Sequence, residues 1–428
     1  MHLKKIFLKN IRCFEEFTLE FEKSNSSVLI VGDNGEGKST LLRSIAMGLC
    51  DSTSASALFR ELGGRFVRRG KEEEDTFIDL YLSNGPEQSF IIETKWRSLK
   101  KSIGGSLESL TQIIFSGHKK NERNIIDQEE FPWKSIFIAG YGAGLRTSGS
   151  ATLDSYLAVD AVYPLFRYDE PLLNPELALR RLVDEEQKRQ GRKSKVVPHR
   201  RFGILNDFLE LLKNILNLGK HDRVYLTRQG IEVRGPWGRC GLESLGDGYK
   251  STIIWVLDLI GRRLLYSRTL NPKQMTGIVL LDEVEQHLHP RWQLNAMPLI
   301  QEAFPKIQFI ATTHSPLVAS GCKNCKIRKI TSKHDESSSV YGWLAEDVYR
   351  EVMDLPTTRY KDVANLIKEF EKLYAKKISG MLSAEDGGKL RKVEEELNRL
   401  PGGDPTVLTT KLKNLRIYLQ EIDKGNKK

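Results

Sequence analysis

The first fifty residues combine strand-like alternation with one helical stretch. KKIFLKNIRCF and FTLEFE alternate apolar and polar positions, which predicts strands, and SSVLIVG is a continuous apolar run typical of a strand buried on both faces. Apolar residues then recur at helical spacing from Lys38 to Gly48. TFIDLYL and SFIIETKW, joined through Ser83 to Pro86, predict a hairpin. The first hundred residues are therefore predicted to form several strands and one helix.

The rest of the chain alternates buried strands with helices. SIFIAGYGAG, GIVLLDEVE and IQFIATTHS predict strands, with a helix from Trp292 to Ala303 between the last two. PELALRRLVDEEQKRQ and LNDFLELLKNIL predict helices. After Thr331 we expect a charged, helical region with successive apolar stripes. The stripes are Val363, Leu366, Ile367, Phe370, Leu373 and Tyr374; Leu390, Val393, Leu397 and Leu400; and Leu408, Leu412, Leu415, Leu419 and Ile422.

Composition narrows the class of protein. The 428 residues are 39% hydrophobic and 29% charged, which suits a globular protein with a substantial core. No apolar run in the sequence reaches the length needed to cross a bilayer, and the first residues do not form a signal peptide pattern. The five cysteines are mostly scattered, as in a reducing compartment. We therefore expect a cytoplasmic protein without a membrane partner.

Cys322 and Cys325 form a CxxC motif. A structural zinc site needs two further ligands at similar spacing, and the sequence offers no evident second pair. We therefore expect two ordinary cysteines near a strand rather than a functional motif.

Residues 188–201 carry seven lysines and arginines and no acidic residue. This basic loop is either a solvated loop or a DNA contact, and the net charge of +10 permits the second reading without establishing it.

A phosphate-binding motif joins the first buried strand to the first helix. Residues 32–39 read GDNGEGKS and match the P-loop pattern GxxxxGK[ST]. Its glycines let backbone N–H groups and the helix N-terminus face a polyphosphate. Lys38 would reach the β- and γ-phosphates of ATP, and Ser39 would ligate Mg²⁺. The expected binding residues are Asn34, Gly35, Gly37, Lys38, Ser39 and Thr40.

The strand GIVLLDE ends in two acids, the form of a Walker B motif. We expect Asp282 to hold Mg²⁺ and Glu283 to orient and polarise the attacking water. Read alone, His287 and His289 beside Glu283 and Glu285 could also be metal ligands.

Two further segments complete the pattern. LESLGDGYKSTIIWVLDLI places Gly246, Asp247 and Gly248 at the head of an apolar helix, a second N-terminus suited to phosphate. FIATTHSP places His314 just past a buried strand, where its imidazole could contact the γ-phosphate.

Together these motifs resemble an ABC-type ATPase head of the RecF/SMC/OLD class, in which P-loop, signature, Walker B and switch histidine follow one another. DExExHLHP and THSP, with LKNIRCF and GYGAGLR, are most similar to stand-alone bacterial AAA-family ATPases. Such ATPases include components of anti-phage systems of the Septu, PARIS and retron-associated types, where the ATPase pairs with a separate effector. The resembling segments are about 1–40, 137–146 and 242–320.

The resemblance implies a mixed sheet around the P-loop helix, and an ATP sandwich between head-to-tail copies. Gly246, Asp247 and Gly248, with Ser244, would then act in trans as the signature. His287 and His289 fall in the D-loop, which favours a role at the dimer interface over a metal site. Two departures stand out: Gly246 replaces the signature serine, and FVRRGKEEED, where a Q-loop is expected, contains no glutamine.

The expected organisation is α/β: an ABC-type ATPase domain over residues 1–330 with a helical and basic insertion at about 165–220, and a C-terminal helical segment over 331–428. That last segment either docks a partner or caps the core. No long heptad stretch separates P-loop and signature, which excludes an SMC-like arm.

The function we expect is an ATPase that uses ATP and Mg²⁺, forms a homodimer or higher homo-oligomer, and controls a separate effector, a nuclease, in anti-phage defence. The alternative is a RecF-like repair ATPase that acts on DNA directly. An OLD-type nuclease is disfavoured because no DxD pair follows His314. The HLHP and THSP forms and the long insertion also disfavour a transporter subunit.

Overall fold

The computed structural model describes residues 1–21, 27–62, 65–71, 74–85, 88–98, 107–117, 123–144, 149, 155–189, 203–227, 230–267, 271–331, 335–355, 357, 359–400 and 409. It divides into two compact units, residues 1–353 and 354–428. Most of the basic loop 188–201, part of GYGAGLR and the third C-terminal stripe lie outside the described residues. Among the described residues, no helix is long and apolar enough to cross a membrane.

The first unit contains an antiparallel sheet with the strand order β2-β1-β4-β5-β6-β7. The expected hairpin is its β4–β5 pair, in full register from Thr76↔Trp96 to Ser83↔Ser89. The bounds are β1 His2–Ile11, β2 Phe14–Glu20, β4 Thr76–Ser83, β5 Gln88–Ser98, β6 Leu107–Gly117 and β7 Arg123–Ile126.

A second sheet, with the order β15-β14-β3-β13-β12-β8, carries the motifs. Its strands are parallel except for the antiparallel edge strand β15. The P-loop strand β3 thus lies beside β13, and the Walker B strand β12 follows. The bounds are β3 Ser27–Val31, β8 Ile138–Tyr141, β12 Gly277–Leu281, β13 Ile307–Thr312, β14 Cys325–Ile330 and β15 Asp335–Ser338.

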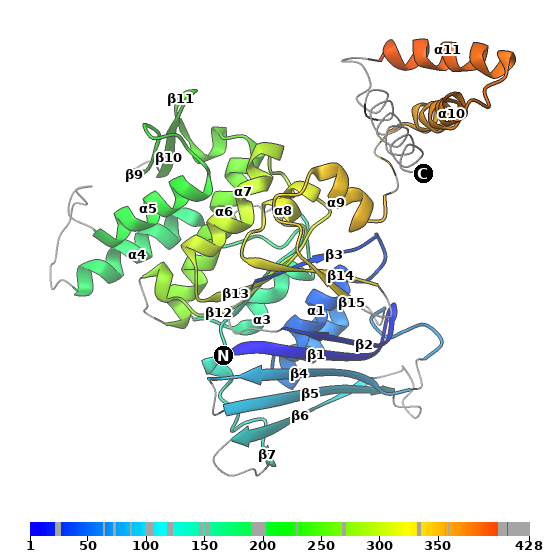
Figure 1. Ribbon diagram of the computed structural model, residues 1–428. Helices are drawn as coiled ribbons and strands as arrows, with labels where there is room; N and C mark the ends of the chain where they lie inside the picture. Colours follow the sequence, from blue (N-terminus) through cyan, green and yellow to red (C-terminus); the bar gives the residue numbers. More distant parts are fainter. Residues whose placement is uncertain are drawn as a thin grey trace, which may run out of the picture. The chain divides into compact units, whose positions relative to one another are not determined.

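The two faces of this sheet belong to different hydrophobic cores. Val28 and Ile30 face a core shared with helices α1 and α2 and the antiparallel sheet, whereas Leu29 and Val31 face a core shared with helices α4 to α9. Because successive strand residues point to opposite sides, a continuous apolar run buries both faces. Helix α1 therefore lies between the two sheets (Figure 1).

The helices of the first unit are α1 Lys38–Gly48, α2 Ser52–Glu61, α3 Ala158–Val162, α4 Pro175–Arg189, α5 Gly203–Ile215, α6 Asp247–Tyr266, α7 Pro290–Ala303, α8 Pro316–Gly321 and α9 Ala345–Glu351. Single 3₁₀ turns are η1 Trp133–Ser135, η2 Tyr163–Leu165, η3 Leu242–Ser244 and η4 Pro272–Gln274. A small sheet with the order β11-β10-β9 precedes α6 and was not expected from sequence; its strands are β9 Arg223–Thr227, β10 Gly230–Gly235 and β11 Gly238–Gly241.

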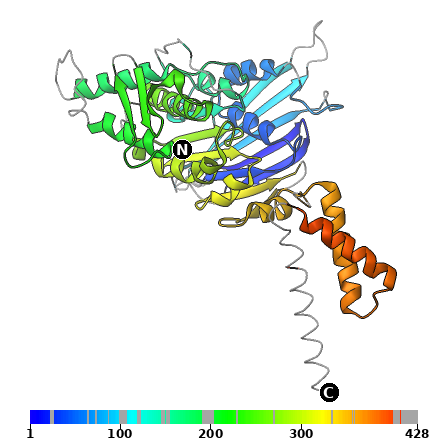
Figure 2. The same cartoon turned by 90° about the horizontal axis from the view of Figure 1, so that it is seen from above.

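The second unit contains α10 Lys361–Ile378 and α11 Ala384–Asn398, which pack side by side (Figure 2). Their contact uses the two stripes expected from sequence, with Phe370 and Leu397 fully buried.

The boundary between the two units follows Met353, whereas the boundary expected from sequence followed residue 330. The region after Thr331, which was expected to be charged and helical, contains helices α9, α10 and α11 and also the strand β15, which extends the motif-bearing sheet. Buried Val340, Val348 and Val352 join the core of the first unit, which explains the later boundary.

Candidate active site

The loop between β3 and α1 adopts a conformation that requires glycine. Gly35 and Gly37 have φ values of 91° and 96°, in the left-handed region. A Cβ atom at Gly37 would lie 2.5 Å from Cys13 Sγ and 2.6 Å from the Phe14 ring. Gly37 occupies the N-cap position of α1, so the first N–H groups of that helix face the loop. An anion would meet backbone donors there.

Lys38 folds back over this loop. Its side chain is buried, and Nζ donates to the carbonyl oxygens of Gly32 at 2.7 Å and Asp33 at 2.9 Å. Burial lowers the pKa of Lys38, while the carboxylates of Asp282 and Glu283 act in the opposite direction. A phosphate group could replace the two carbonyls as the partner of this ammonium group.

A cavity of about 360 Å³ opens beside the loop. Its lining joins P-loop residues with Walker B and switch residues expected from sequence, namely Asn34, Gly35, Gly37, Lys38, Ser39, Thr40, Asp282, Glu283 and His314. The lining also includes four residues to which no sequence motif gave a role, namely Arg12, Cys13, Arg43 and Tyr168. The volume is within the range of small-ligand sites.

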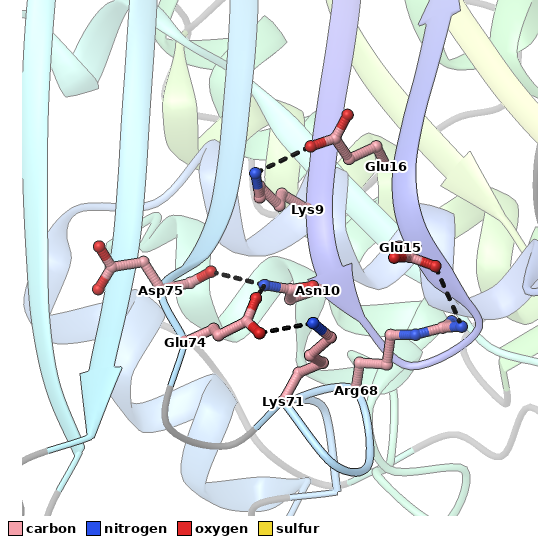
Figure 3. A network of polar contacts seen from close by, with 8 residues as sticks. All are labelled: Lys9, Asn10, Glu15, Glu16, Arg68, Lys71, Glu74 and Asp75. Carbon is pink, nitrogen blue, oxygen red and sulfur yellow. Dashed lines mark hydrogen bonds and ion pairs between the residues drawn. The ribbon is translucent and has the colours of Figure 1, made fainter.

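Arg12 reaches the cavity because of an unusual turn between β1 and β2. Asn10 and Arg12 have φ values of 55° and 46°, which non-glycine residues seldom adopt. The segment FVRRGKEEED holds this turn: Arg68 donates its backbone N–H to Asn10 O at 2.9 Å and its guanidinium to Cys13 O at 2.6 Å. The Asn10 amide donates to Glu74 (Figure 3). The segment where a Q-loop was expected thus braces the turn instead.

Arg43 adds a second guanidinium to the same cavity. It donates to Leu165 O at 3.0 Å and to the Tyr168 hydroxyl at 2.9 Å. Burial, followed by the charge of Arg43, lowers the pKa of Arg12. Together with Lys38, these cations favour an anionic ligand. Helical spacing from Thr40 could have indicated Arg43, but Arg12 and Tyr168 come from distant segments without such a pattern.

The Walker B acids are positioned by Thr312 on the neighbouring strand. The Thr312 hydroxyl donates to Asp282 Oδ1 at 2.7 Å and accepts the backbone N–H of Glu283 at 2.8 Å. Glu283 has a φ of 48°, so the chain turns sharply after β12. The two adjacent carboxylates consequently have separate surroundings, as distinct roles require.

Asp282 has the properties of a metal ligand. Its side chain is 1% exposed, and among the described residues Oδ2 has no hydrogen-bond partner. An unpaired buried carboxylate oxygen is costly unless a cation or water satisfies it. The hydroxyl of Ser39 lines the same cavity, and hydroxyl and carboxylate oxygens suit Mg²⁺. Asp282 and Ser39 therefore fit a magnesium ion.

Glu283 is only partly exposed, and burial raises its pKa, with further increases from the carboxylates of Asp282 and Glu285. The neighbouring charges of His314 and Lys38 act in the opposite direction. A carboxylate with a raised pKa is a better proton acceptor, which suits a general base.

Glu285 fixes the backbone of the switch histidine. Its two carboxylate oxygens accept the Thr313 hydroxyl and the His314 N–H, each at 2.6 Å. Ser315 then caps α8 and donates its hydroxyl to Gln293 at 2.6 Å. These bonds hold His314 at the cavity wall.

The D-loop histidines are exposed and lie outside the cavity lining. His289 is the N-cap of α7, where its Nδ1 accepts the Arg291 N–H at 3.3 Å. His287 has a φ of 65°. In the described part of the chain, no group of three or more His, Cys, Asp or Glu side chains is arranged to hold a metal ion.

The signature residues Ser244, Gly246, Asp247 and Gly248 also lie outside the cavity lining. Gly246 is the exposed N-cap of α6, and a Cβ atom there would meet nothing within 4 Å. A Cβ at Gly248 would instead lie 2.5 Å from His287 O. The residues expected to form the signature therefore contact the loop that carries His287, and they do not line the P-loop cavity of their own chain.

A buried polar cluster connects α6 to the Walker B strand. Asp258 is fully buried; its carboxylate accepts the Tyr141 hydroxyl and the Leu173 N–H at 2.8 Å each, and the Arg262 guanidinium at 2.7 Å. The Tyr141 carbonyl accepts the N–H of Asp282 at 2.8 Å. Tyr141 therefore joins helix α6 to the end of β12 that carries Asp282.

A second hollow, of about 390 Å³, lies between α5 and α7. Its lining includes the carboxylates of Asp207, Glu210 and Glu302. These charges would repel a triphosphate, so the cavity at the P-loop is the better nucleotide site.

The chain is similar to known ATPases and to two family models. The retron Vc95 probable ATPase of Vibrio cholerae (serotype O1 biovar El Tor) is 35% identical over 443 residues, which covers 86% of this chain and 84% of that protein. The chain belongs to the family of the retron probable ATPases. Family profiles agree: one described as an AAA domain matches residues 5–214, and one described as "AAA domain, putative AbiEii toxin, Type IV TA system" matches 243–320.

A longer protein is also similar to the chain. Septu protein PtuA of Bacillus mycoides (strain KBAB4) is 24% identical over 381 residues, covering 87% of this chain and 46% of that protein. The chain thus spans less than half the length of PtuA. The SMC head domain from Thermotoga maritima has a TM-score of 0.43 at 15% identity, covering 79% of this chain and 99% of that one. Family membership and the two sheets around α1 confirm the expected α/β fold of an ABC-type P-loop ATPase.

Proposed function

We propose that this chain binds and hydrolyses ATP between two head-to-tail copies, and that this cycle controls a separate effector, a nuclease, in anti-phage defence. The observation that supports ATP hydrolysis best is the single cavity where Lys38, the unpaired oxygen of Asp282, and Glu283 meet. The retron and Septu relatives support the defence role.

In the proposed hydrolysis, the residues of the cavity have three different roles. Backbone N–H groups at Gly35 and Gly37, with Lys38, Arg12 and Arg43, bind and orient the triphosphate. Ser39 and Asp282 would hold Mg²⁺, and the ion would supply positive charge to offset that of the phosphates. Glu283 orients the attacking water and accepts its proton, and His314, held by Glu285, contacts the γ-phosphate.

The pairing of copies rests on the signature tip. Ser244, Gly246 and Asp247 are exposed and lie off the cavity of their own chain. A helix N-terminus presented to solvent can complete the phosphate site of a mate. A head-to-tail pair would use this tip twice, once at each nucleotide.

Mixing two inactive variants tests that arrangement. Lys38→Ala removes the phosphate contact, and Gly246→Asp puts a carboxylate at the signature tip, where the space is open and aspartate is a good N-cap. Each variant alone should be inactive. Random pairing of an equal mixture should restore up to roughly a quarter of the parental ATPase rate, since half the pairs are mixed and each has one intact site. If the mixture stays as inactive as its parts, the sandwich is excluded.

The raised pKa of Glu283 gives a pH dependence. Glu283 must be ionised to accept a proton, so hydrolysis should be lost as the pH falls through this raised pKa. The acid limb of kcat/KM should therefore lie above the pH range of an ordinary glutamate. An acid limb at the ordinary glutamate position would show that another group controls the rate.

A further inference from the structure

The sulfur atoms of Cys322 and Cys325 are in contact, and the two Cα atoms are 5.7 Å apart. This separation is within the usual range for disulfides. The pair is therefore placed to form a disulfide, which the expectation of two ordinary cysteines did not include. The remaining cysteines, Cys13, Cys50 and Cys240, are free.

The two sulfurs differ in access. Cys322 is 2% exposed and belongs to the large core, whereas Cys325 is partly exposed at the start of β14. Exposed lysines, Lys323 and Lys326, are their sequence neighbours, and nearby cations favour the reactive thiolate. An accessible attacking sulfur next to a sheltered resolving sulfur is the arrangement of a reversible redox pair.

Cys322 and Cys325 lie at the two ends of the short connection between α8 and β14, and both of these elements adjoin the proposed nucleotide site. Cys322 ends α8, which begins directly after His314 and its capping neighbour Ser315. Cys325 opens β14, which pairs with the P-loop strand β3 over its length. At the far end of β14, a Cβ atom on Gly32 would lie 2.7 Å from Ile330 O, so this strand packs directly under the P-loop.

We propose that Cys322 and Cys325 form a reversible dithiol–disulfide site that exchanges with low-molecular-weight disulfides and adjusts nucleotide affinity. Disulfides in cytosolic proteins are usually transient and redox-sensing, which fits this class of site. The effect on affinity rests on the proposed ATP-binding function, whereas the exchange itself does not.

The exchange takes place in two steps. The Cys325 thiolate attacks a disulfide RSSR, forming a mixed disulfide and releasing RS⁻. The Cys322 thiolate then attacks Cys325 sulfur and releases the second RS⁻. Two protein thiols lose two electrons and RSSR gains them, while the two protons leave with the RSH products.

Thiol counting tests the exchange. The full-length protein would be equilibrated in reduced and oxidised glutathione mixtures, alkylated after denaturation, and weighed by mass spectrometry. In the parent we expect two thiols to disappear together across the series. Cys322→Ser should lose only one thiol, as the unresolved mixed disulfide at Cys325, and Cys325→Ser should lose none. Cys240→Ser, at another partly exposed cysteine, should behave like the parent. Loss of thiols one at a time, or equal loss in the serine variants, would overturn the proposal.

ATP titration of the two redox forms tests the effect on the site. The oxidised form holds His314 and the P-loop strand together, so its ATP Kd should be about fivefold lower than that of the reduced form. In Cys325→Ser, which lacks the attacking thiol, Kd should not respond to glutathione. If the oxidised and reduced forms bind ATP equally well, the proposed effect on nucleotide affinity is wrong, but the thiol–disulfide exchange is not. A parent that binds no ATP in either form would instead contradict the proposed function.

Discussion

Glu283→Gln should lower the ATPase rate by about 10²- to 10⁴-fold, the usual contribution of a general base, while ATP binding remains. Glutamine keeps the shape of glutamate and leaves the backbone N–H bond to Thr312 intact, so the fold should be unaffected. Because ATP then stays bound, we expect the variant to accumulate as a dimer. Steady-state hydrolysis, nucleotide retention and size-exclusion chromatography with light scattering measure these three effects.

Glu302→Gln provides the matched control, because Glu302 is exposed on α7 and lines the other hollow. It should hydrolyse ATP at the parental rate. Parental hydrolysis in Glu283→Gln would mean that a different group activates the water.

Lys38→Ala should reduce ATP affinity by about a hundredfold or more. A hydrogen bond to a charged group contributes about 1.5–3 kcal/mol, and this ammonium also offsets phosphate charge inside a partly buried cavity. Among the described residues, the Lys38 ammonium group donates to the carbonyl oxygens of Gly32 and Asp33, so the loss of its side chain should cost little stability. Isothermal titration calorimetry with ATP and Mg²⁺ measures the affinity.

Lys9→Ala is the comparison for this variant, because Lys9 pairs with Glu16 on the β1–β2 hairpin, outside the cavity lining. Its ATP affinity should equal that of the parent. If Lys38→Ala binds ATP as tightly as Lys9→Ala does, the cavity beside the P-loop is not the nucleotide site.

Sequence patterns predicted the elements on which the motifs lie. The helix expected from Lys38 to Gly48 has those bounds in the structure, and the β4–β5 hairpin and α6 also appear where expected. These predictions succeeded because apolar periodicity and glycine positions are local properties. The P-loop and Walker B residues carry a local signal as well, and the structure brings them to one cavity.

The residues that sequence patterns did not assign depend on tertiary contacts. Arg12 enters the cavity because Arg68 and Asn10 hold a left-handed turn, which no periodicity encodes. Thr312 aligns the Walker B acids only because β13 is the neighbour of β12. The Cys322–Cys325 bond likewise depends on how α8 turns into β14.

Tyr141 connects two parts of the proposed ATPase site that would have to move together. Through Asp258 it fastens the helix that carries the signature tip to the strand edge that carries Asp282. If one copy shifts this edge when its own ATP arrives, the tip that it offers to the other copy must tilt as well. ATP bound at one site would then change the ATP affinity of the second site.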